Sequence, residues 1–324
     1  MHELRKDPLI GRWVAVLGDS WEPGAYESLK RRTEEAAPCP LCPGGDSLEE
    51  VASLGAVRVV RSPAPVLFPH GDLGRRGVGM YDRMNSIGVT EIVIESPEHD
   101  RQTEDLGSEH MRTVIHMHRE RMMAIGEDER IRYILVSKSV GVLAGSVNSH
   151  PHSQILAAPV IPLRIKTELD GAKEYYSYKD RCIFCDMRDE EARSGERVIL
   201  ETEHFMAFCP YASKFPFEFW VIPKRHTCAF RDITGQEVAD LGGVMATLLG
   251  RMKTVLQGPS YSYVLHTAPN RIPRRNHWHT LGEDYHWHIE VAPRLLRASG
   301  FEWGSGFYVL NTSPEDAAGY LREG

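Results

Sequence analysis

Two cysteine pairs with the spacing Cys-x-x-Cys are the residues of this sequence most suited to metal or redox chemistry. Cys39 and Cys42 form the first pair, and Cys182 and Cys185 form the second. In a reducing compartment such pairs are typical of metal sites or redox motifs rather than of disulfides. We therefore expect a metal clamp or a redox motif in each half of the chain.

Histidines supply the other ligands that a metal ion would need. The chain has 15 histidines in 324 residues, and His99 and His150 follow the first cysteine pair. Two thiolates and two imidazoles, from Cys39, Cys42, His99 and His150, make a tetrahedral set that is typical of a closed structural zinc site. In the alternative interpretation, His99 belongs to a surface loop and the cysteine pair marks only a turn.

His152 lies two residues after His150 and has the spacing of a free nucleophile. On an extended strand, residues i and i+2 share a face, so a metal ion at His150 leaves the His152 ring facing the same cleft. A neutral imidazole whose tautomer is fixed by a backbone carbonyl is a good nucleophile at phosphorus. Gln154, next on that face, can donate its amide to a phosphoryl oxygen. This pattern favours phosphoryl or nucleotidyl transfer, and the alternative is one larger metal site containing all three residues.

The elements that must position these residues recur in the same order in both halves. Each half is predicted to contain a cysteine pair, strands, a histidine after a strand, one long helix, a further strand and a His-x-His strand. The helices are expected at about 106–125 and 235–256, where apolar residues recur at spacings of three and four. The His-x-His strands are expected at 149–156 and 285–291. The sequence therefore predicts an α+β fold, a tandem duplication of an antiparallel sheet with one long helix per half.

The boundary between the halves is expected in a proline-containing stretch at 159–164, followed by a charged connector that reaches about residue 179. This stretch predicts an N-terminal domain at residues 1–165 and a C-terminal domain at residues 166–324. Each half is long enough to bury a core of its own.

The overall charge argues against two classes of partner. The chain has 38 Lys+Arg against 45 Asp+Glu, a formal net charge of −7, whereas nucleic-acid and membrane-surface proteins need a basic face. No apolar run approaches the ~20 residues of a membrane span, and the N-terminus is charged from its third residue. We therefore expect a cytoplasmic protein that binds neither nucleic acid nor membranes.

The segment Ser-His-Pro-His-Ser-Gln at 149–154 resembles the active-site strand of the galactose-1-phosphate uridylyltransferase family, a branch of the histidine-triad superfamily. Other segments resemble the same family, in its order and over nearly the whole chain: RKDPLIGRWV, CPLCPG, IESPEH, ETEHF, PFEFWVIPKRH, YHWHIEVAPRL and GFEWGSGFYVLNTSPEDAA. The resemblance implies a tandem pair of histidine-triad-like halves and a homodimer.

The resemblance also implies roles for individual residues. It makes His152 the nucleophile that takes the nucleotidyl group, and Gln154 its phosphoryl-oxygen partner. It implies that zinc is bound by the first set of ligands, Cys39, Cys42, His99 and His150. It places four further residues at substrate-contacting positions: Ser139, Ser146, Phe301 and Glu302.

Two ligand sets compete for a second metal site in the second half. One family branch, which includes a plant ADP-glucose phosphorylase, implies zinc bound by Cys182, Cys185, His226 and His286. Another branch implies iron or zinc bound by Glu168, His266, His286 and His288. Thiolates are the stronger zinc ligands, so we favour the cysteine set and expect two zinc ions per chain.

Three nucleotide-contacting segments depart from the family's pattern. Residues 18–23 carry acids where the family has two arginines, and the nearest substitutes are Lys30, Arg31 and Arg32. Arg61, Ser62 and Pro63 stand where the family has Asn-Asp or Asn-Lys near the ribose, and Ser139 stands where it has an asparagine before the His-Pro-His strand. The chemistry is therefore better supported than the identity of the sugar or the base.

The resemblance implies a ping-pong reaction that transfers UMP between UDP-hexose and hexose 1-phosphate through a nucleotidyl-His152 intermediate. The substrates would be a nucleotide sugar and a sugar 1-phosphate. The alternatives are an ADP-sugar phosphorylase or adenylyltransferase, a nucleotidyltransferase of specialised metabolism, and a zinc-stabilised nucleotide-binding protein without turnover.

Overall fold

The structure is a computed structural model that describes residues 2–9, 11–16, 39–44, 48–146, 148–270, 279–297 and 299–324. Its strands are β1 (Glu3–Lys6), β2 (Trp13–Val16), β3 (Glu50–Leu54), β4 (Val57–Arg61), β5 (Arg76–Val78), β6 (Tyr81–Asn85), β7 (Val89–Ile94), β8 (Tyr133–Val140), β9 (His152–Ala158), β10 (Val198–Glu201), β11 (Phe205–Phe208), β12 (Phe219–Pro223), β13 (Tyr261–His266) and β14 (His288–Pro293). Its helices are η1 (Thr103–Leu106), α2 (Ser108–Gly126), η2 (Val142–Ala144), α3 (Leu163–Lys179), α4 (Ile183–Ser194), η3 (Phe230–Asp232), α5 (Gly235–Val255), α6 (Leu281–Asp284), α7 (Gly300–Ser305) and α8 (Pro314–Glu323).

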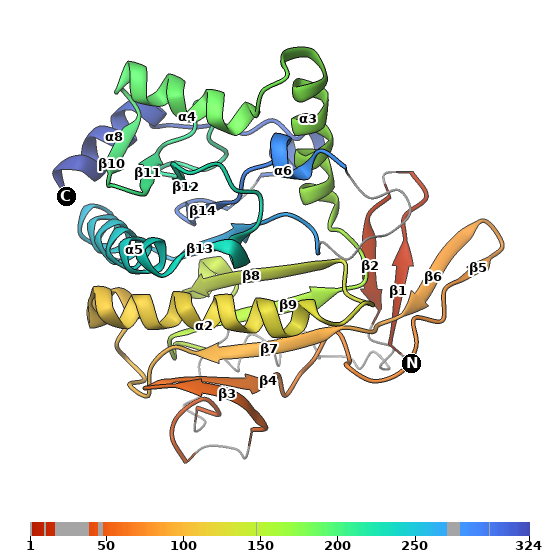
Figure 1. Ribbon diagram of the computed structural model, residues 1–324. Coiled ribbons are helices and arrows are strands. Elements are labelled where there is room, and N and C mark those ends of the chain that lie inside the picture. The colour runs from red at the N-terminus through yellow and green to blue at the C-terminus, as the bar shows by residue number, and fades with distance from the viewer. Residues whose placement is uncertain are drawn as a thin grey trace.

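One antiparallel sheet runs through both halves, in the order β10-β11-β12-β14-β13-β8-β9-β7-β4-β3. The five strands of the first half, read inward from β3, have the same chain order as the five strands of the second half, read inward from β10. The halves meet where β13 pairs with β8, with Val264 opposite Ser137. This arrangement confirms the predicted antiparallel α+β fold (Figure 1). The division at residues 165 and 166 stays a prediction, because the sheet is continuous across it.

The two long helices, α2 and α5, form where the apolar spacing predicts them and lie against each other (Figure 1). Their buried residues and those of the sheet form the main hydrophobic core. Thr234 caps α5 by accepting a hydrogen bond from the Glu237 backbone N–H at 3.2 Å, and Glu237 accepts one from the Thr234 N–H at 2.8 Å. Such a reciprocal cap satisfies two backbone donors at the helix start.

The segment expected as a charged connector is instead the helix α3, which corrects the sequence interpretation. Ile165, Leu169 and Ala172 are buried on one side of α3. Their spacing of four and three residues is helical, but the charged residues between them hid the pattern. Each His-x-His strand also begins later than predicted, at His152 and at His288.

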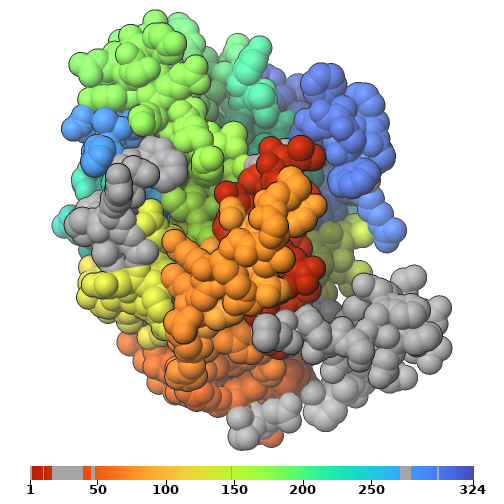
Figure 2. Space-filling model, turned by 90° about the vertical axis from the view of Figure 1, so that its right-hand side faces the viewer, coloured from red at the N-terminus to blue at the C-terminus, as the bar shows by residue number. Residues whose placement is uncertain are grey.

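A separate four-stranded sheet, in the order β2-β1-β6-β5, stands beside the large one. Leu4 of β1 and Met84 of β6 pack near Leu156 of β9. Figure 2 faces this small sheet, whose red and orange segments occupy the middle of the view below the green helices. Leu156 lies on the same face of β9 as His152, because side chains at every second position of a strand point to one face. The small sheet is therefore on the His152 side, opposite α2.

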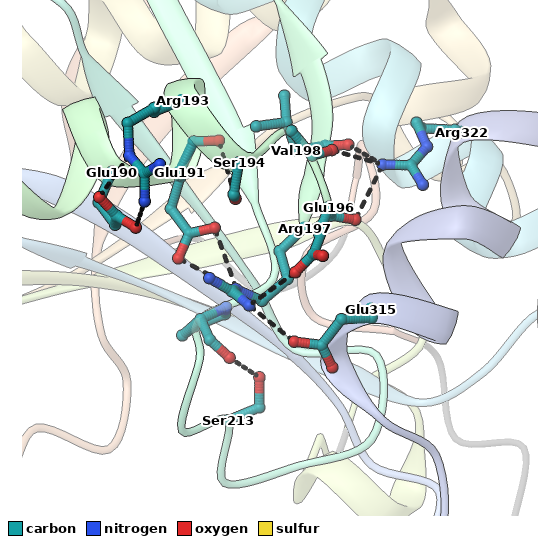
Figure 3. A network of polar contacts seen from close by, with 12 residues as sticks. Glu190, Glu191, Arg193, Ser194, Glu196, Arg197, Val198, Ser213, Glu315 and Arg322 are labelled. Carbon is teal, nitrogen blue, oxygen red and sulfur yellow. Dashed lines mark hydrogen bonds and ion pairs between the residues drawn. The ribbon is translucent and has the colours of Figure 1, made fainter.

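The C-terminal helix α8 is tied to the edge strand β10 by two arginines (Figure 3). Arg197 donates to Glu191 at 3.0 Å and to Glu315 of α8 at 2.7 Å. Arg322 donates to the Val198 carbonyl at 2.6 Å. These bonds hold α8 beside a strand edge that would otherwise be open to pairing. Among the described residues, no helix combines the length and the apolar character needed to cross a bilayer.

Candidate active site and metal centres

The first cysteine pair, His99 and His150 come together in space, although long stretches of chain separate them. The Cys42 Sγ atom lies 3.3 Å from His99 Nδ1 and 3.5 Å from His150 Nδ1. The ligand atoms of Cys39 and of these three residues all lie within 4.8 Å of one another. In a tetrahedral zinc site the sulfur and nitrogen ligands are roughly 3.6 Å apart, so the donor set and its spacing fit that metal.

The outer nitrogens of the two histidines have hydrogen-bond partners that suit metal binding. His150 Nε2 lies 2.7 Å from the Ser96 carbonyl, to which it donates. His99 Nε2 lies 2.7 Å from the Ser149 hydroxyl. A proton on Nε2 leaves the lone pair on Nδ1, the nitrogen that faces the thiol sulfur. Burial also lowers the pKa of His150, which favours the neutral ring that a metal ion requires.

The second cysteine pair makes a group with the same geometry. Cys185 Sγ lies 3.3 Å from His226 Nδ1 and 3.5 Å from His286 Nδ1. His226 Nε2 donates to the Gly282 carbonyl at 2.9 Å. The hydrogen bond from Cys182, followed by those from the two histidines, lowers the pKa of the Cys185 thiol. This set also fits a tetrahedral metal ion.

A third group of possible ligands consists of Glu168, His266, His288 and Glu290. It differs from the alternative set drawn from the sequence, because His286 lies in the cysteine group and Glu290 takes its place. The two sets of the second half are therefore separate clusters and do not compete for one position. Glu290 was missed, although it follows His288 by two residues and so lies on the same face of β14.

A hydrogen bond and an ion pair with an arginine hold the third group together. His266 Nδ1 lies 2.8 Å from Glu168 Oε2, and Arg164 of α3 forms an ion pair with Glu290. Burial alone would raise the pKa of Glu290, but the neighbouring His288, His266 and Arg164 hold it well below its usual range. His288 Nε2 and Glu290 Oε1, which are 3.8 Å apart, are buried without hydrogen-bond partners. These two atoms could face a bound cation.

His152, the first residue of β9, is held by a bond to its own segment. Its Nδ1 lies 2.7 Å from the His150 carbonyl oxygen. A carbonyl only accepts hydrogen bonds, so in the neutral ring Nδ1 carries the proton and Nε2 carries the lone pair. Among the described residues, no hydrogen bond reaches Nε2. The described part of the chain therefore leaves the His152 Nε2 atom without a partner, and the residue is 8% exposed.

Gln154 and Ser139 lie on the same side of the sheet as His152. Gln154 is exposed and pairs with Ser137 of β8, so the two side chains point to one face. Ser139, two residues further along β8, shares that face and its hydroxyl lies 3.3 Å from Ser262. Ser146 lies in the loop after η2 and donates to the Asn148 carbonyl at 2.7 Å.

Phe301 and Glu302 lie on α7, where the hydrogen bonds of Glu302 are local. Its carboxylate accepts from the Ser299 N–H at 2.7 Å and from the Val309 N–H at 3.4 Å, which caps the helix. Phe301 is 57% exposed. Sugar contact by these two residues stays a prediction.

Three segments depart from the family's pattern, and one of them, residues 61–63, contains Arg61, whose side chain donates to Glu49 at 2.7 Å. Residues 18–23 and the three basic residues that follow, Lys30, Arg31 and Arg32, lie outside the described residues.

Known proteins match this sequence along nearly the whole chain. Residues 76–162 match the N-terminal domain, and residues 168–311 the C-terminal domain, of galactose-1-phosphate uridyl transferase. An ADP-glucose phosphorylase of Arabidopsis thaliana is 32% identical and is matched over 99% of this chain and 92% of its own length. A galactose-1-phosphate uridylyltransferase of Thermotoga maritima is 26% identical, over 100% of this chain and 98% of its own. A solved uridylyltransferase structure superimposes with a TM-score of 0.85 at 27% identity, covering 99% of this chain and 98% of its own.

Proposed function

The chain belongs to the galactose-1-phosphate uridylyltransferase family and is a nucleotidyltransferase, and from that premise we propose that it transfers UMP between UDP-hexose and hexose 1-phosphate. The observation that carries the proposal is the 2.7 Å bond from His152 Nδ1 to the His150 carbonyl, which leaves Nε2 as the nucleophile. Gln154, exposed on the same strand face, is the proposed donor to a phosphoryl oxygen.

In the first half-reaction, the His152 Nε2 lone pair attacks the α-phosphorus of the nucleotide sugar. A phosphorus–nitrogen bond forms, the bond from phosphorus to the bridging oxygen breaks, and its electron pair leaves with hexose 1-phosphate. Nδ1 keeps its proton, and the hydrogen bond to the His150 carbonyl stabilises the positive charge that develops on the ring. Because the leaving group is a stable phosphate anion, no strong general acid is required.

In the second half-reaction, a phosphate oxygen of another hexose 1-phosphate attacks the same phosphorus. The phosphorus–nitrogen bond breaks, its electron pair returns to Nε2, and the neutral ring of His152 is restored. Catalysis then depends mainly on the position of the two nucleophiles relative to the phosphorus.

We propose zinc for each of the two cysteine-containing groups, because each offers two sulfur and two nitrogen ligands at tetrahedral spacing. A metal ion bound at either group would be structural and would stabilise the fold, and an ion at the first group would also hold His150, whose carbonyl orients His152. The third group, with only nitrogen and oxygen ligands, suits zinc or iron.

A second candidate function is ADP-sugar phosphorolysis, which the 32% identity to the Arabidopsis ADP-glucose phosphorylase favours. The first half-reaction would be the same, with AMP carried on His152. Inorganic phosphate would then be the acceptor, and ADP the product.

The test is incubation with UDP-glucose or ADP-glucose labelled at the α-phosphorus, without an acceptor. We expect acid-labile, base-stable label on the protein and one equivalent of glucose 1-phosphate released. Label from only one donor identifies the nucleotide, and label from neither would contradict both functions. Subsequent chase with galactose 1-phosphate or with inorganic phosphate separates the transferase from the phosphorylase.

We also propose that the chain is a cytoplasmic homodimer, as its family resemblance implies. Phe301, exposed on α7, and Glu302 are the proposed sugar contacts. Light scattering of the purified protein measures the mass of the assembly, and a mass of one chain would contradict the dimer.

A further inference from the structure

A hydrogen bond on the side of β9 opposite His152 joins the strand to α2. Ser153 follows His152 and points to the opposite face, where its hydroxyl lies 2.7 Å from His118 Nε2. Both residues are buried. These side chains lie beside the main hydrophobic core, between the sheet and the helices.

A buried ion pair lies on the same side and reaches the same segment through the backbone. Lys138 Nζ lies 2.5 Å from Glu95 Oε2 and donates to Thr103 at 3.0 Å, and the side chains of Lys138 and Glu95 are each only 1% exposed. The Glu95 N–H donates to the Pro151 carbonyl at 3.0 Å. The residue between His150 and His152 is therefore tied to an element that the ion pair anchors.

The second half of the chain provides an internal comparison, because its matching positions are apolar. Met245 lies ten residues after the first residue of α5, as His118 lies ten residues after the first residue of α2. Ile289 follows His288 as Ser153 follows His152. Met245 and Ile289 are both members of the main hydrophobic core. At the position that matches Glu95, after Ile222, stands Pro223, which has no N–H to donate.

A buried polar pair contributes little net stability compared with an apolar pair of similar size, and it fixes geometry instead. The polar pair occurs in the half whose histidine is free to react, and the apolar pair occurs in the half whose histidine is fully buried. The fold therefore does not need the hydrogen bond at this position in order to form.

We propose that His118 and Ser153 are positioning residues for the nucleophile. Their hydrogen bond fixes the strand behind His152 so that the His150 carbonyl keeps its contact with Nδ1 and Nε2 stays aimed at the α-phosphorus. This inference rests on the proposed function for its kinetic consequence and on the structure alone for its geometric one.

The test compares His118→Met, which installs the residue of the second half, with His118→Gln, whose amide can still bond Ser153. For His118→Met we expect the single-turnover rate of protein labelling to fall by about tenfold to a hundredfold, with an unchanged donor KM, metal content and thermal midpoint. His118→Gln should restore most of the rate. Ser153→Ala should resemble His118→Met and replaces it if that variant does not fold. Met245→Leu, at the matching position of α5, is the control and should label like the wild type.

A second readout is independent of turnover: the exchange of the His152 Nδ1 proton with solvent, followed by NMR of 15N-histidine protein. We expect slow exchange in the wild type and in His118→Gln, and faster exchange in His118→Met. Slow exchange in His118→Met, or a rate loss that merely follows loss of folded protein, would overturn the positioning role. If the wild type takes no label from either donor, the proposed function fails, and the proton exchange still decides the geometric claim.

Discussion

The two His-x-His segments use one backbone arrangement in two different surroundings. His152 Nδ1 lies 2.7 Å from the His150 carbonyl, and His288 Nδ1 lies 3.2 Å from the His286 carbonyl. In each segment the earlier histidine faces a cysteine. His152, however, is 8% exposed, whereas His288 is 0% exposed and its ring stacks on Trp220 at 4.6 Å.

The residues that cover the second histidine explain the difference. Where the first half has the exposed Gln154, the second half has Glu290, which faces His288 and forms an ion pair with Arg164 of α3. Through Arg164 and Glu168, α3 covers the site of the second half. The comparison teaches that the tautomer alone does not make a histidine a nucleophile, because Nε2 must also be reachable by a substrate.

The largest expected effect is that of His152→Asn. Without Nε2 no phosphorus–nitrogen bond can form, so labelling and turnover should fall by at least ~10³-fold. The metal content should not change, and atomic absorption of the purified variant measures it. A variant that lost metal would make His152 a ligand and would contradict its assignment as the nucleophile.

Removing one thiolate from each metal group separates the halves by function. Cys42→Ser and Cys185→Ser should each lose one metal ion and at least about 3 kcal/mol of stability, because metal binding at such sites is folding energy. Only Cys42→Ser should also slow the labelling of the protein that remains folded, since only its group holds His150. Equal labelling rates in the two variants, measured per folded protein, would break the comparison.

His288→Asn should affect stability rather than chemistry. Loss of the buried ring and its stacking on Trp220 should lower the free energy of unfolding by about 1–3 kcal/mol. Urea unfolding measures this change, and the folded variant should still take label. A loss of label that exceeds the loss of folded protein would mean that the second segment takes part in the reaction.

The smallest effect expected at pH 7 is that of His118, whose contribution to stability emerges only as the pH falls. Burial lowers the pKa of His118 to about 4, below the ordinary value of 6.5, so the unfolded chain binds a proton that the folded chain does not. Stability should therefore fall as the pH drops from about 6.5 towards 4, by up to about 3 kcal/mol from this residue. His118→Met should make the decrease shallower in urea unfolding between pH 7 and 5. An unchanged slope would show that His118 is not held neutral.

The sequence predicts the parts of the site that depend on local spacing. The cysteine pairs, the two His-x-His segments and the stripes of the long helices all follow from periods of two to four residues. The duplication then places them, since each half repeats the same order of strands.

The remaining parts of the site depend on contacts between distant segments, which leave no local signal in the sequence. Arg164 reaches Glu290 across 126 residues, and His118 reaches Ser153 across 35. His118 occupies a position of the helix stripe that an apolar residue would also fill. The Lys138–Glu95 ion pair likewise joins β8 to the residue that follows β7, a strand that is not a neighbour of β8 in the sheet.

The most direct test of the account is to locate the nucleotidyl group on the wild-type chain. After labelling without an acceptor and digestion at alkaline pH, which preserves a phosphorus–nitrogen bond, mass spectrometry identifies the modified peptide. The account predicts one nucleotidyl group per chain, on the peptide that contains His152, and an unmodified peptide at His288. A nucleotidyl group at His288, or at any residue other than His152, would contradict it.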